Sequence, residues 1–214
     1  MSHRATRTRS VWCWRATLAL AAVLTVIQPE PGFSADNPVR TYHDHGVYDY
    51  YAPASYPPRL IKNVLGYHIK PAEEGLKAGN WTKAEGNIGF ILNYFPNHPE
   101  GLKLALAYAA KSGHDRFALD RIKKALDINP KIAWTHLVYG VYLHRHNDLA
   151  AAEREYRKAT ELDTDLADAY YNLGLLLVDA GNIADAKKAA QKAYNLGYPL
   201  PGLRLKLQKA KKSE

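Results

Sequence analysis

An internal repeat with a period of about 34 residues constrains this chain more than any other feature. With residues 167–200 taken as one unit, the twentieth residue is an alanine, and three equal backward steps of one period reach another alanine each time. The twentieth position reads Ala84, Ala118, Ala152 and Ala186. The eighth position of the last two units holds Gly140 and Gly174. Self-similarity at a fixed period of this length predicts small units that stack side by side and share one continuous core.

The recurrent small residues have a physical reason. Two helices cross closely only where neither presents a large side chain, so we expect these alanines and glycines to be packing residues. The fifteenth position reads Gly79, Gly113, Asn147 and Gly181. Glycine and asparagine tolerate the left-handed backbone that ends a helix. Pro96 and Pro130 then stop the second helix of a pair.

The pattern predicts about four helix-turn-helix units, at residues 65–98, 99–132, 133–166 and 167–200. Two residues depart from it. Pro71 falls inside the first helix of the first unit and predicts that this helix is truncated. Leu106 replaces the small eighth residue of the second unit.

The segments AKSGHDRFALDRIKKALDINP and DAYYNLGLLLVDAGNIADAKKAAQKA resemble tetratricopeptide (TPR) repeats. The resemblance covers roughly residues 65–198 and implies an all-α fold, an α-solenoid of paired antiparallel helices in a right-handed superhelix. The blocks GYHIKPAEEGL, ILNYFPNHPEGL and NLGYPLPGLRLKL are also similar to small secreted proteobacterial TPR proteins of unassigned activity. That similarity supports export and fold but supplies no mechanism.

Residues 1–35 follow the order of a secretory signal peptide. Four arginines precede an apolar run from Ala16 to Ile27, and prolines follow before the small pair Ser34-Ala35. The run of about 12 apolar residues is shorter than the roughly 20 that span a bilayer, so an uncleaved anchor is the alternative. We expect export to the periplasm or cell envelope of a Gram-negative bacterium, with membrane contact only through an uncleaved leader.

Cysteine and charge exclude several classes of function. The single cysteine, Cys13, lies within the leader, so the mature chain has no disulfide, thiolate metal site or cysteine nucleophile. Residues 36–214 hold 25 Lys and Arg against 20 Asp and Glu, and most of the excess lies after Gly202. A nucleic-acid groove needs many phosphate contacts from one basic face, so we expect no nucleic-acid partner.

The segments on either side of the repeats have distinct compositions. Residues 36–64 are crowded with tyrosine and proline. We expect an irregular, extended arm that lies along the repeats, with their groove as one location, and a disordered linker is the alternative. In residues 199–214, Leu203, Leu207 and Ala210 recur on one face with lysines opposite. This pattern predicts a basic capping helix over the last pair, with a membrane-surface or partner-docking helix as the alternative.

The TPR resemblance implies that the first helices line a concave groove, with positions 2, 5, 9, 12 and 13 pointing into it. Trp134 is the first candidate because a buried aromatic anchor with a charged rim concentrates binding energy, although it also fits simple packing on the preceding helix. The expected partner-binding residues are Lys103, Lys111, Trp134, Leu137, Val141, His144, Arg145, Tyr171 and Leu175. The carboxylate clamp of chaperone-binding TPR proteins needs basic residues near position 13 of the last unit. This chain has Asp179 there, so we do not expect it to capture the terminal carboxylate of a peptide.

The leading hypothesis is therefore an exported scaffold that binds a protein or peptide through its groove. A different class is a periplasmic ligand- or metal-binding protein that uses His43 and His45, whose spacing on an extended segment points both side chains the same way. His144 and His146 lie on a helix and diverge by about 200°. The chain has no glycine-rich phosphate loop, nucleophile-elbow serine or zinc-protease helix, so we expect no enzyme activity and no cofactor.

Overall fold

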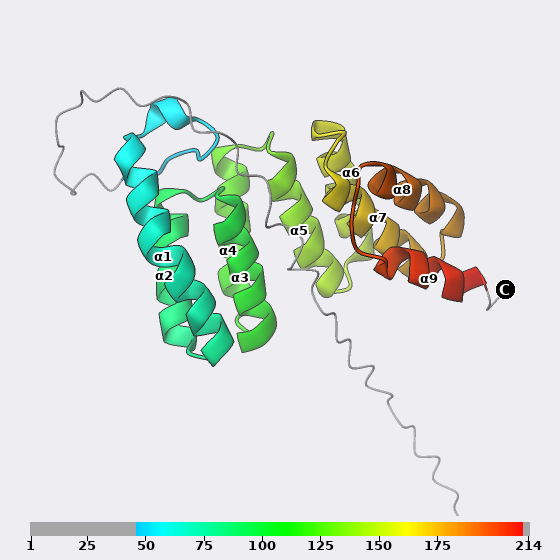
Figure 1. Cartoon of the computed structure of the whole chain (residues 1–214), viewed down its shortest axis with the longest axis horizontal. Coiled ribbons are helices and arrows are strands. Elements are labelled where there is room, and N and C mark those ends of the chain that lie inside the picture. Colours follow the sequence, from blue (N-terminus) through cyan, green and yellow to red (C-terminus); the bar gives the residue numbers. More distant parts are fainter. Residues whose placement is uncertain (1–45, 212–214) are drawn as a thin grey trace, which may run out of the picture. The chain divides into compact units, whose positions relative to one another are not determined.

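The computed structural model describes residues 46–211, in which every regular element is a helix (Figure 1). A short 3-10 helix, η2 (Pro53–Ser55), comes first. The α-helices are α1 (Pro58–Ala78), α2 (Trp81–Tyr94), α3 (Pro99–Ser112), α4 (Asp115–Ile128), α5 (Ala133–Arg145), α6 (Leu149–Leu162), α7 (Ala167–Asp179), α8 (Ile183–Asn195) and α9 (Gly202–Lys211). Among these described helices, none has both the length and the apolar character needed to cross a membrane.

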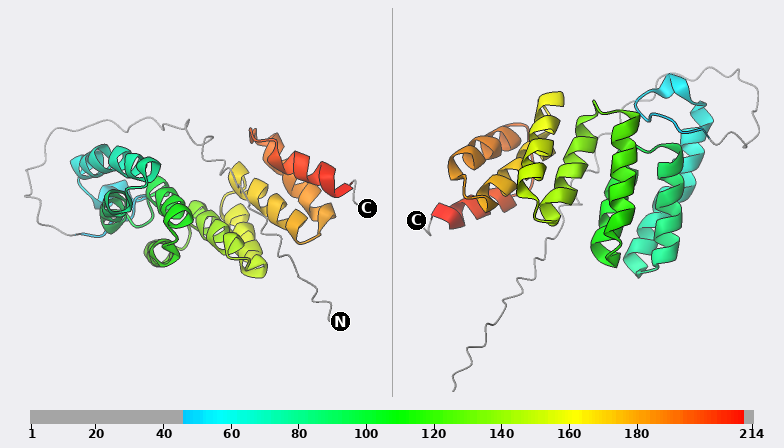
Figure 2. Two further views of the ribbon diagram at one scale, coloured as in Figure 1. Left: turned by 90° about the horizontal axis from the view of Figure 1, so that it is seen from below. Right: turned by 180° about the vertical axis from the view of Figure 1, so that it is seen from behind.

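The helices follow the repeat register of the sequence. α2, α4, α6 and α8 begin at residues 81, 115, 149 and 183, and α3, α5 and α7 begin at residues 99, 133 and 167. Each first helix packs on the second helix that follows it, and each second helix packs on the next first helix. The pairs succeed one another in chain order (Figure 2). The predicted all-α solenoid is confirmed.

The turn inside each pair uses the predicted backbone. Asn147 has a φ of 61° and is the only non-glycine with positive φ among residues 46–211. Gly79, Gly113 and Gly181 occupy the same left-handed region at the equivalent position. Here glycine ends the first helix without the steric cost that a Cβ would bring.

Small side chains lie where helices cross. The four alanines of the twentieth position are fully buried. At Gly140 an added Cβ would lie 2.5 Å from the ring of the buried Tyr156, and at Gly174 it would lie 2.5 Å from Leu203 of α9. The tightest approach to backbone occurs at Gly75, where a Cβ would lie 2.7 Å from the backbone N of Ala84. Gly75 stands at position 11 of its unit, whereas the sequence predicts packing residues only at the eighth and twentieth positions.

Helix α1 corrects two expectations. It begins at Pro58, so residues 58–64, assigned to the arm, are helical; an extended Pro57 and a proline at the first helical position favour this start. α1 also continues through Pro71 and is not truncated there. The carbonyl that loses its partner to this proline belongs to Tyr67, which is 73% exposed, so water can replace the missing donor.

Residues 46–57 lie against the links between repeats. Tyr48 N donates to Tyr94 O at 2.8 Å, and the ring of Tyr56 packs edge-on against the buried Phe95, 4.8 Å between centroids. The Asp49 carboxylate accepts hydrogen bonds from Asn97 Nδ2 at 2.6 Å and Asn129 Nδ2 at 2.8 Å. The described part of the arm therefore lies along the repeats, at the ends of α2 and α4. Residues 36–45 lie outside the described residues.

A buried histidine begins α3. His98 is 4% exposed, and its Nδ1 accepts a hydrogen bond from the backbone N of Gly101 at 3.1 Å, which caps the helix. Burial lowers the pKa of His98 to about 3. The neutral imidazole is therefore the form that the fold accommodates.

Helix α9 covers the last pair, as predicted. It begins at residue 202, about one repeat length beyond the start of α7 at residue 167, and contacts both α7 and α8, so it occupies the place of a fifth first helix. Leu203 is fully buried beside Gly174. Just before α9, the ring of Tyr198 stacks on that of Tyr171 with centroids 4.1 Å apart.

Candidate partner-binding face

Three consecutive first helices lie next to one another, because α3 contacts α5 and α5 contacts α7. Their ninth positions form an apolar row of Ala107, Val141 and Leu175. We call the five groove positions of these helices the first-helix face; it comprises Glu100, Lys103, Ala107, Ala110, Lys111, Trp134, Leu137, Val141, His144, Arg145, Asp168, Tyr171, Leu175, Val178 and Asp179.

Cations on this face reach back to the preceding first helix. Lys111 Nζ lies 3.3 Å from the carbonyl oxygen of Leu76 in α1, and Arg145 Nη1 lies 3.2 Å from that of Leu106 in α3. Lys206 of α9 approaches the carbonyl oxygen of Leu175 in α7, at 3.5 Å. These contacts hold the basic side chains across the seams between first helices.

Asp179 lies between two basic side chains. His144 Nε2 is 3.3 Å from Asp179 Oδ2, and Lys206 Nζ is 2.5 Å from Oδ1. Burial opposes ionisation of this carboxyl, but the hydrogen bonds from His144 and Lys206 prevail and lower its pKa. The sequence reasoning missed Lys206, although one more step of the repeat period would have placed α9 beside α7.

Two of the candidate residues offer little surface to a partner. Leu137 is 3% exposed and belongs to the core around Ala152 and Tyr156. Tyr171 is 6% exposed and lies beneath Tyr198 and α9. Leu175 is half-buried in the same cluster. The α7 part of the face is therefore covered by the chain's own C-terminal segment.

The α3 and α5 part of the face remains accessible. Trp134 is half-buried, packs on the cores of both neighbouring repeats and donates from Nε1 to Pro99 O at 3.4 Å. Val141 is half-buried about two turns further along the same face of α5, and Ala110 is exposed. Lys103 forms an ion pair with Glu100 at 2.6 Å. The packing role of Trp134 is thus present, and part of its ring stays open to a partner.

His144 and His146 do not share a metal site in the described part of the chain. His144 contacts Asp179, whereas His146 Nε2 lies 3.4 Å from Asp115 Oδ1, so the two rings meet different carboxylates. Among residues 46–211, no three His, Cys, Asp or Glu side chains lie close enough to hold one ion. His43 and His45 lie outside the described residues.

Family models match the C-terminal half of the repeats. A model described as TPR repeat matches residues 140–181, and one described as tetratricopeptide repeat matches residues 167–196. Among curated proteins, the mouse protein O-mannosyl-transferase TMTC1 is 30% identical over 122 residues, 55% of this chain and 13% of the mouse protein. The human TMTC1 is 33% identical over 97 residues, 44% of this chain and 11% of the human protein. The chain thus spans a small fraction of these relatives.

Solved structures share the fold at low sequence identity. A structure from a study of Pseudomonas aeruginosa PilF superposes with a TM-score of 0.58 at 19% identity, covering 72% of this chain and 70% of that one. The thermophilic TPR protein TTC0263 of Thermus thermophilus gives 0.56 at 23% identity, with 71% and 87% covered. MamA gives 0.53 at 23% identity, with 70% and 81% covered. Residues 140–196 therefore carry tetratricopeptide repeats, and the helical pairs that recur in a constant register share the fold of the solved TPR protein structures.

Proposed function

We propose that this protein is an exported scaffold that binds a segment of another polypeptide on the α3–α5 part of its first-helix face. One observation carries the proposal: the half-buried Trp134 and Val141 of α5 and the exposed Ala110 of α3 stand at groove positions of two first helices that contact each other, with cations at other positions of the same face. An aromatic anchor inside a charged rim is the arrangement that concentrates binding energy at protein interfaces.

The charges on this face indicate the chemistry of the partner. Lys103, Lys111 and Arg145 border the apolar centre, although Glu100 pairs with Lys103 and Asp115 lies 3.8 Å from Arg145 Nη2. A segment with apolar side chains and flanking carboxylates complements this border. The face is less suited to the terminal carboxylate of a peptide, because position 13 of the last unit is Asp179 and its basic neighbours are already engaged with it.

A matched pair of substitutions tests the face. Ala110 and Ala150 are both exposed helix residues, but Ala110 lies on α3 within the first-helix face and Ala150 lies on the second helix α6. Partners are identified by cross-linking and mass spectrometry on intact cells. We expect Ala110→Arg to reduce recovery of the partner by about tenfold or more, because a long charged side chain would block the apolar centre. Ala150→Arg should leave recovery unchanged, and equal recovery with both variants would refute the assignment.

Export is the second part of the proposal and rests on residues 1–35 alone. Their basic start, apolar run and small-residue pair have the order that export machinery recognises. The full chain and a chain beginning at residue 36 are expressed in a Gram-negative host and separated into periplasmic and cytoplasmic fractions. Only the full chain should reach the periplasm, in a shortened form, and equal distribution of the two would contradict export.

A further inference from the structure

The outer face of α2 differs from those of the other second helices. At the twenty-second, twenty-fifth and twenty-sixth positions of the repeat, α2 carries Gly86, Gly89 and Phe90. The later second helices carry Asp120, Lys123 and Lys124, then Arg154, Arg157 and Lys158, then Lys188, Gln191 and Lys192. Glycine is the costliest residue in a helix interior apart from proline, so local helix stability does not favour this choice.

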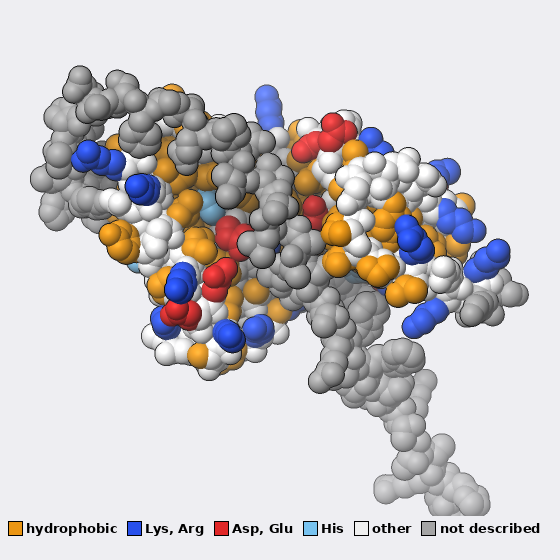
Figure 3. Space-filling model, in the orientation of Figure 1, with side chains coloured by type: hydrophobic (Ala, Val, Ile, Leu, Met, Phe, Trp, Pro, Cys, Tyr) orange, Lys and Arg blue, Asp and Glu red, His pale blue; other side chains and the backbone are white. Residues whose placement is uncertain are grey.

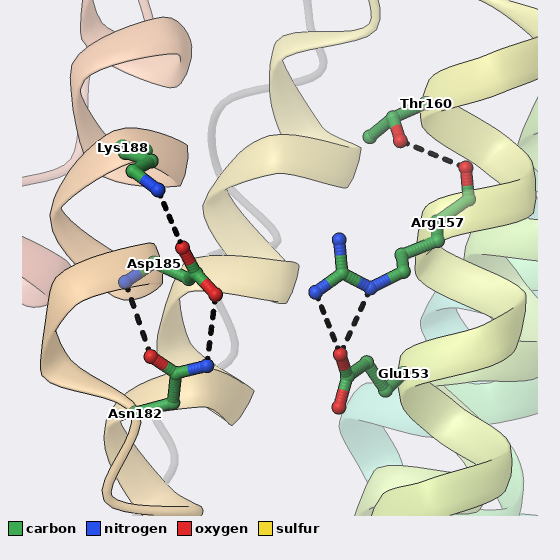
Figure 4. Close-up of polar contacts among 6 residues, drawn as sticks. All are labelled: Glu153, Arg157, Thr160, Asn182, Asp185 and Lys188. Carbon is green, nitrogen blue, oxygen red and sulfur yellow. Dashed lines mark hydrogen bonds and ion pairs between the residues drawn. The ribbon is translucent and has the colours of Figure 1, made fainter.

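At these positions the later second helices carry polar or charged side chains in place of glycine and phenylalanine. Figure 4 shows this region for α6 and α8, where Arg157 pairs with Glu153 at 2.7 Å and Lys188 pairs with Asp185 at 2.9 Å. The Arg157 guanidinium points across toward α8 (Figure 4). Arg157 and Lys188 stand at the two positions that are glycine in α2. Lysine and arginine side chains also surround the α8–α9 end in the space-filling view of Figure 3.

Between α2 and α4 the corresponding space is an open cleft of about 540 Å³. Gly86 lies on its wall with no atom within 4 Å of an added Cβ, and at Gly89 the nearest such atom is Arg121 Nη2 at 3.5 Å. Aromatic rings supply the apolar lining, namely Trp81, Phe90, Tyr108 and Phe117. Phe90 is 39% exposed and also borders a smaller hollow of about 270 Å³ between α1 and α2, beside the exposed Tyr67.

One acidic and one basic side chain, Glu85 and Arg121, line this cleft. Glu85 accepts a hydrogen bond from the hydroxyl of Tyr108, and Arg121 Nη1 donates to Asn93 Oδ1 at 2.6 Å. The Arg121 guanidinium lies beside both Gly89 and Asn93, one and two turns beyond Glu85 on α2, and it is attracted electrostatically by Glu85. Among the described residues, neither Glu85 nor Arg121 has a partner of opposite charge within ion-pair distance.

We propose that the α2–α4 cleft binds a polypeptide segment that inserts a large apolar side chain beside Phe90 and carries a basic residue toward Glu85 and an acidic residue toward Arg121. The apolar rings and the two glycines admit the side chain, and the two charges fix the direction of the segment. This site uses second helices and is independent of the first-helix face, so the chain has two separate surfaces for polypeptides.

The later repeats supply a substitution that closes the cleft and keeps the helix. In α6 the equivalent residues are Arg154 and Lys158, so the double variant Gly86→Arg, Phe90→Lys carries side chains that a second helix of this fold already accommodates. Arginine also favours the helix over glycine. We therefore expect the double variant to fold with a thermal midpoint no lower than that of the original chain.

The probe is a library of random dodecapeptides displayed on phage and selected on the full chain. Enriched peptides are synthesised with a fluorescent label, and their affinities are measured by anisotropy against the original chain, the double variant and Ala110→Arg. The proposal expects one large apolar residue between a basic and an acidic residue, about a tenfold or greater loss of affinity with the double variant, and no change with Ala110→Arg. Replacing the peptide's basic residue by glutamate should weaken binding, and Glu85→Lys should restore it.

Four results would overturn the proposal. They are the absence of any enriched peptide, equal affinity for the original chain and the double variant, loss of affinity only with Ala110→Arg, and a concentration-dependent dimer of the original chain that dissociates in the double variant. The third would leave the first-helix face in place and remove the cleft. Failure of Ala110→Arg to affect the cellular partner would remove the first-helix face and leave the cleft.

Discussion

Replacing Gly75 by alanine tests the close crossing of α1 and α2. The new Cβ would lie 2.7 Å from the backbone N of Ala84, 3.0 Å from its Cα and 3.1 Å from its Cβ. These atoms belong to the frame of a neighbouring helix and cannot rotate away, so α1 and α2 must separate by several tenths of an ångström. Overpacking of a core costs about 1–3 kcal/mol. The same change gains about 1 kcal/mol of helix propensity, so the net loss of unfolding free energy should be about 0–2 kcal/mol.

A matched control removes the propensity term. Gly86 lies in α2 with no atom within 4 Å of an added Cβ, so Gly86→Ala should stabilise the protein by about 0.5–1 kcal/mol. The difference between the two alanine variants then reports the crossing alone, at about 1–3 kcal/mol. Urea unfolding followed by far-UV circular dichroism measures both. Equal stability of the two variants, or a more stable Gly75→Ala, would refute the reasoning.

Three further predictions concern the cap, the arm and the C-terminal helix. Because His98 has a folded pKa of about 3 against about 6.5 when unfolded, its contribution is complete above pH 6.5, and about 2 kcal/mol is lost by pH 5. His98→Asn keeps a capping side chain and should flatten this part of the stability profile in urea titrations; an unchanged slope would contradict it. Asp49→Ala leaves the buried amide of Asn97 without its acceptor, so it should cost about 1–3 kcal/mol and speed hydrogen exchange at residues 94–98, whereas unchanged exchange would count against the contact. Leu203→Ala should cost about 2–5 kcal/mol in chemical denaturation, whereas Leu205→Ala, at a residue 52% exposed, should cost much less; similar losses would exclude the capping role of α9.

The repeat register could be derived from the sequence because it rests on local constraints. A left-handed residue must end each first helix, and the alanines of the twentieth position must fit a crossing, so both leave a mark in every repeat. The start of α1 carries no such mark, because it precedes the first repeat unit at residue 65. Pro57-Pro58 favours an extended backbone, but the apolar residues that follow, including Val64, belong to a helix that packs on Phe95.

The candidate site was harder to derive because exposure depends on what covers each face. Tyr171 stands at a groove position, yet Tyr198 stacks on it and α9 follows. The composition of residues 199–214 predicted the covering helix but not the side chains that it would bury. The α2–α4 cleft did have a sequence signal, since Gly86 and Phe90 replace charged residues of the later repeats. The cleft is therefore visible in the sequence at the twenty-second and twenty-sixth repeat positions, which do not belong to the buried packing positions.

Site-specific photo-cross-linking in intact cells tests the central claim most directly. A photoreactive amino acid is placed at Ala110 on the first-helix face, at Phe90 beside the cleft, or at Ala150 on α6, one position per chain. The account predicts a cross-link to one defined protein from Ala110 and none to that protein from Ala150. No cross-link from Ala110, or a cross-link to the same protein from Ala150, would contradict it, and a cross-link from Phe90 alone would leave only the cleft.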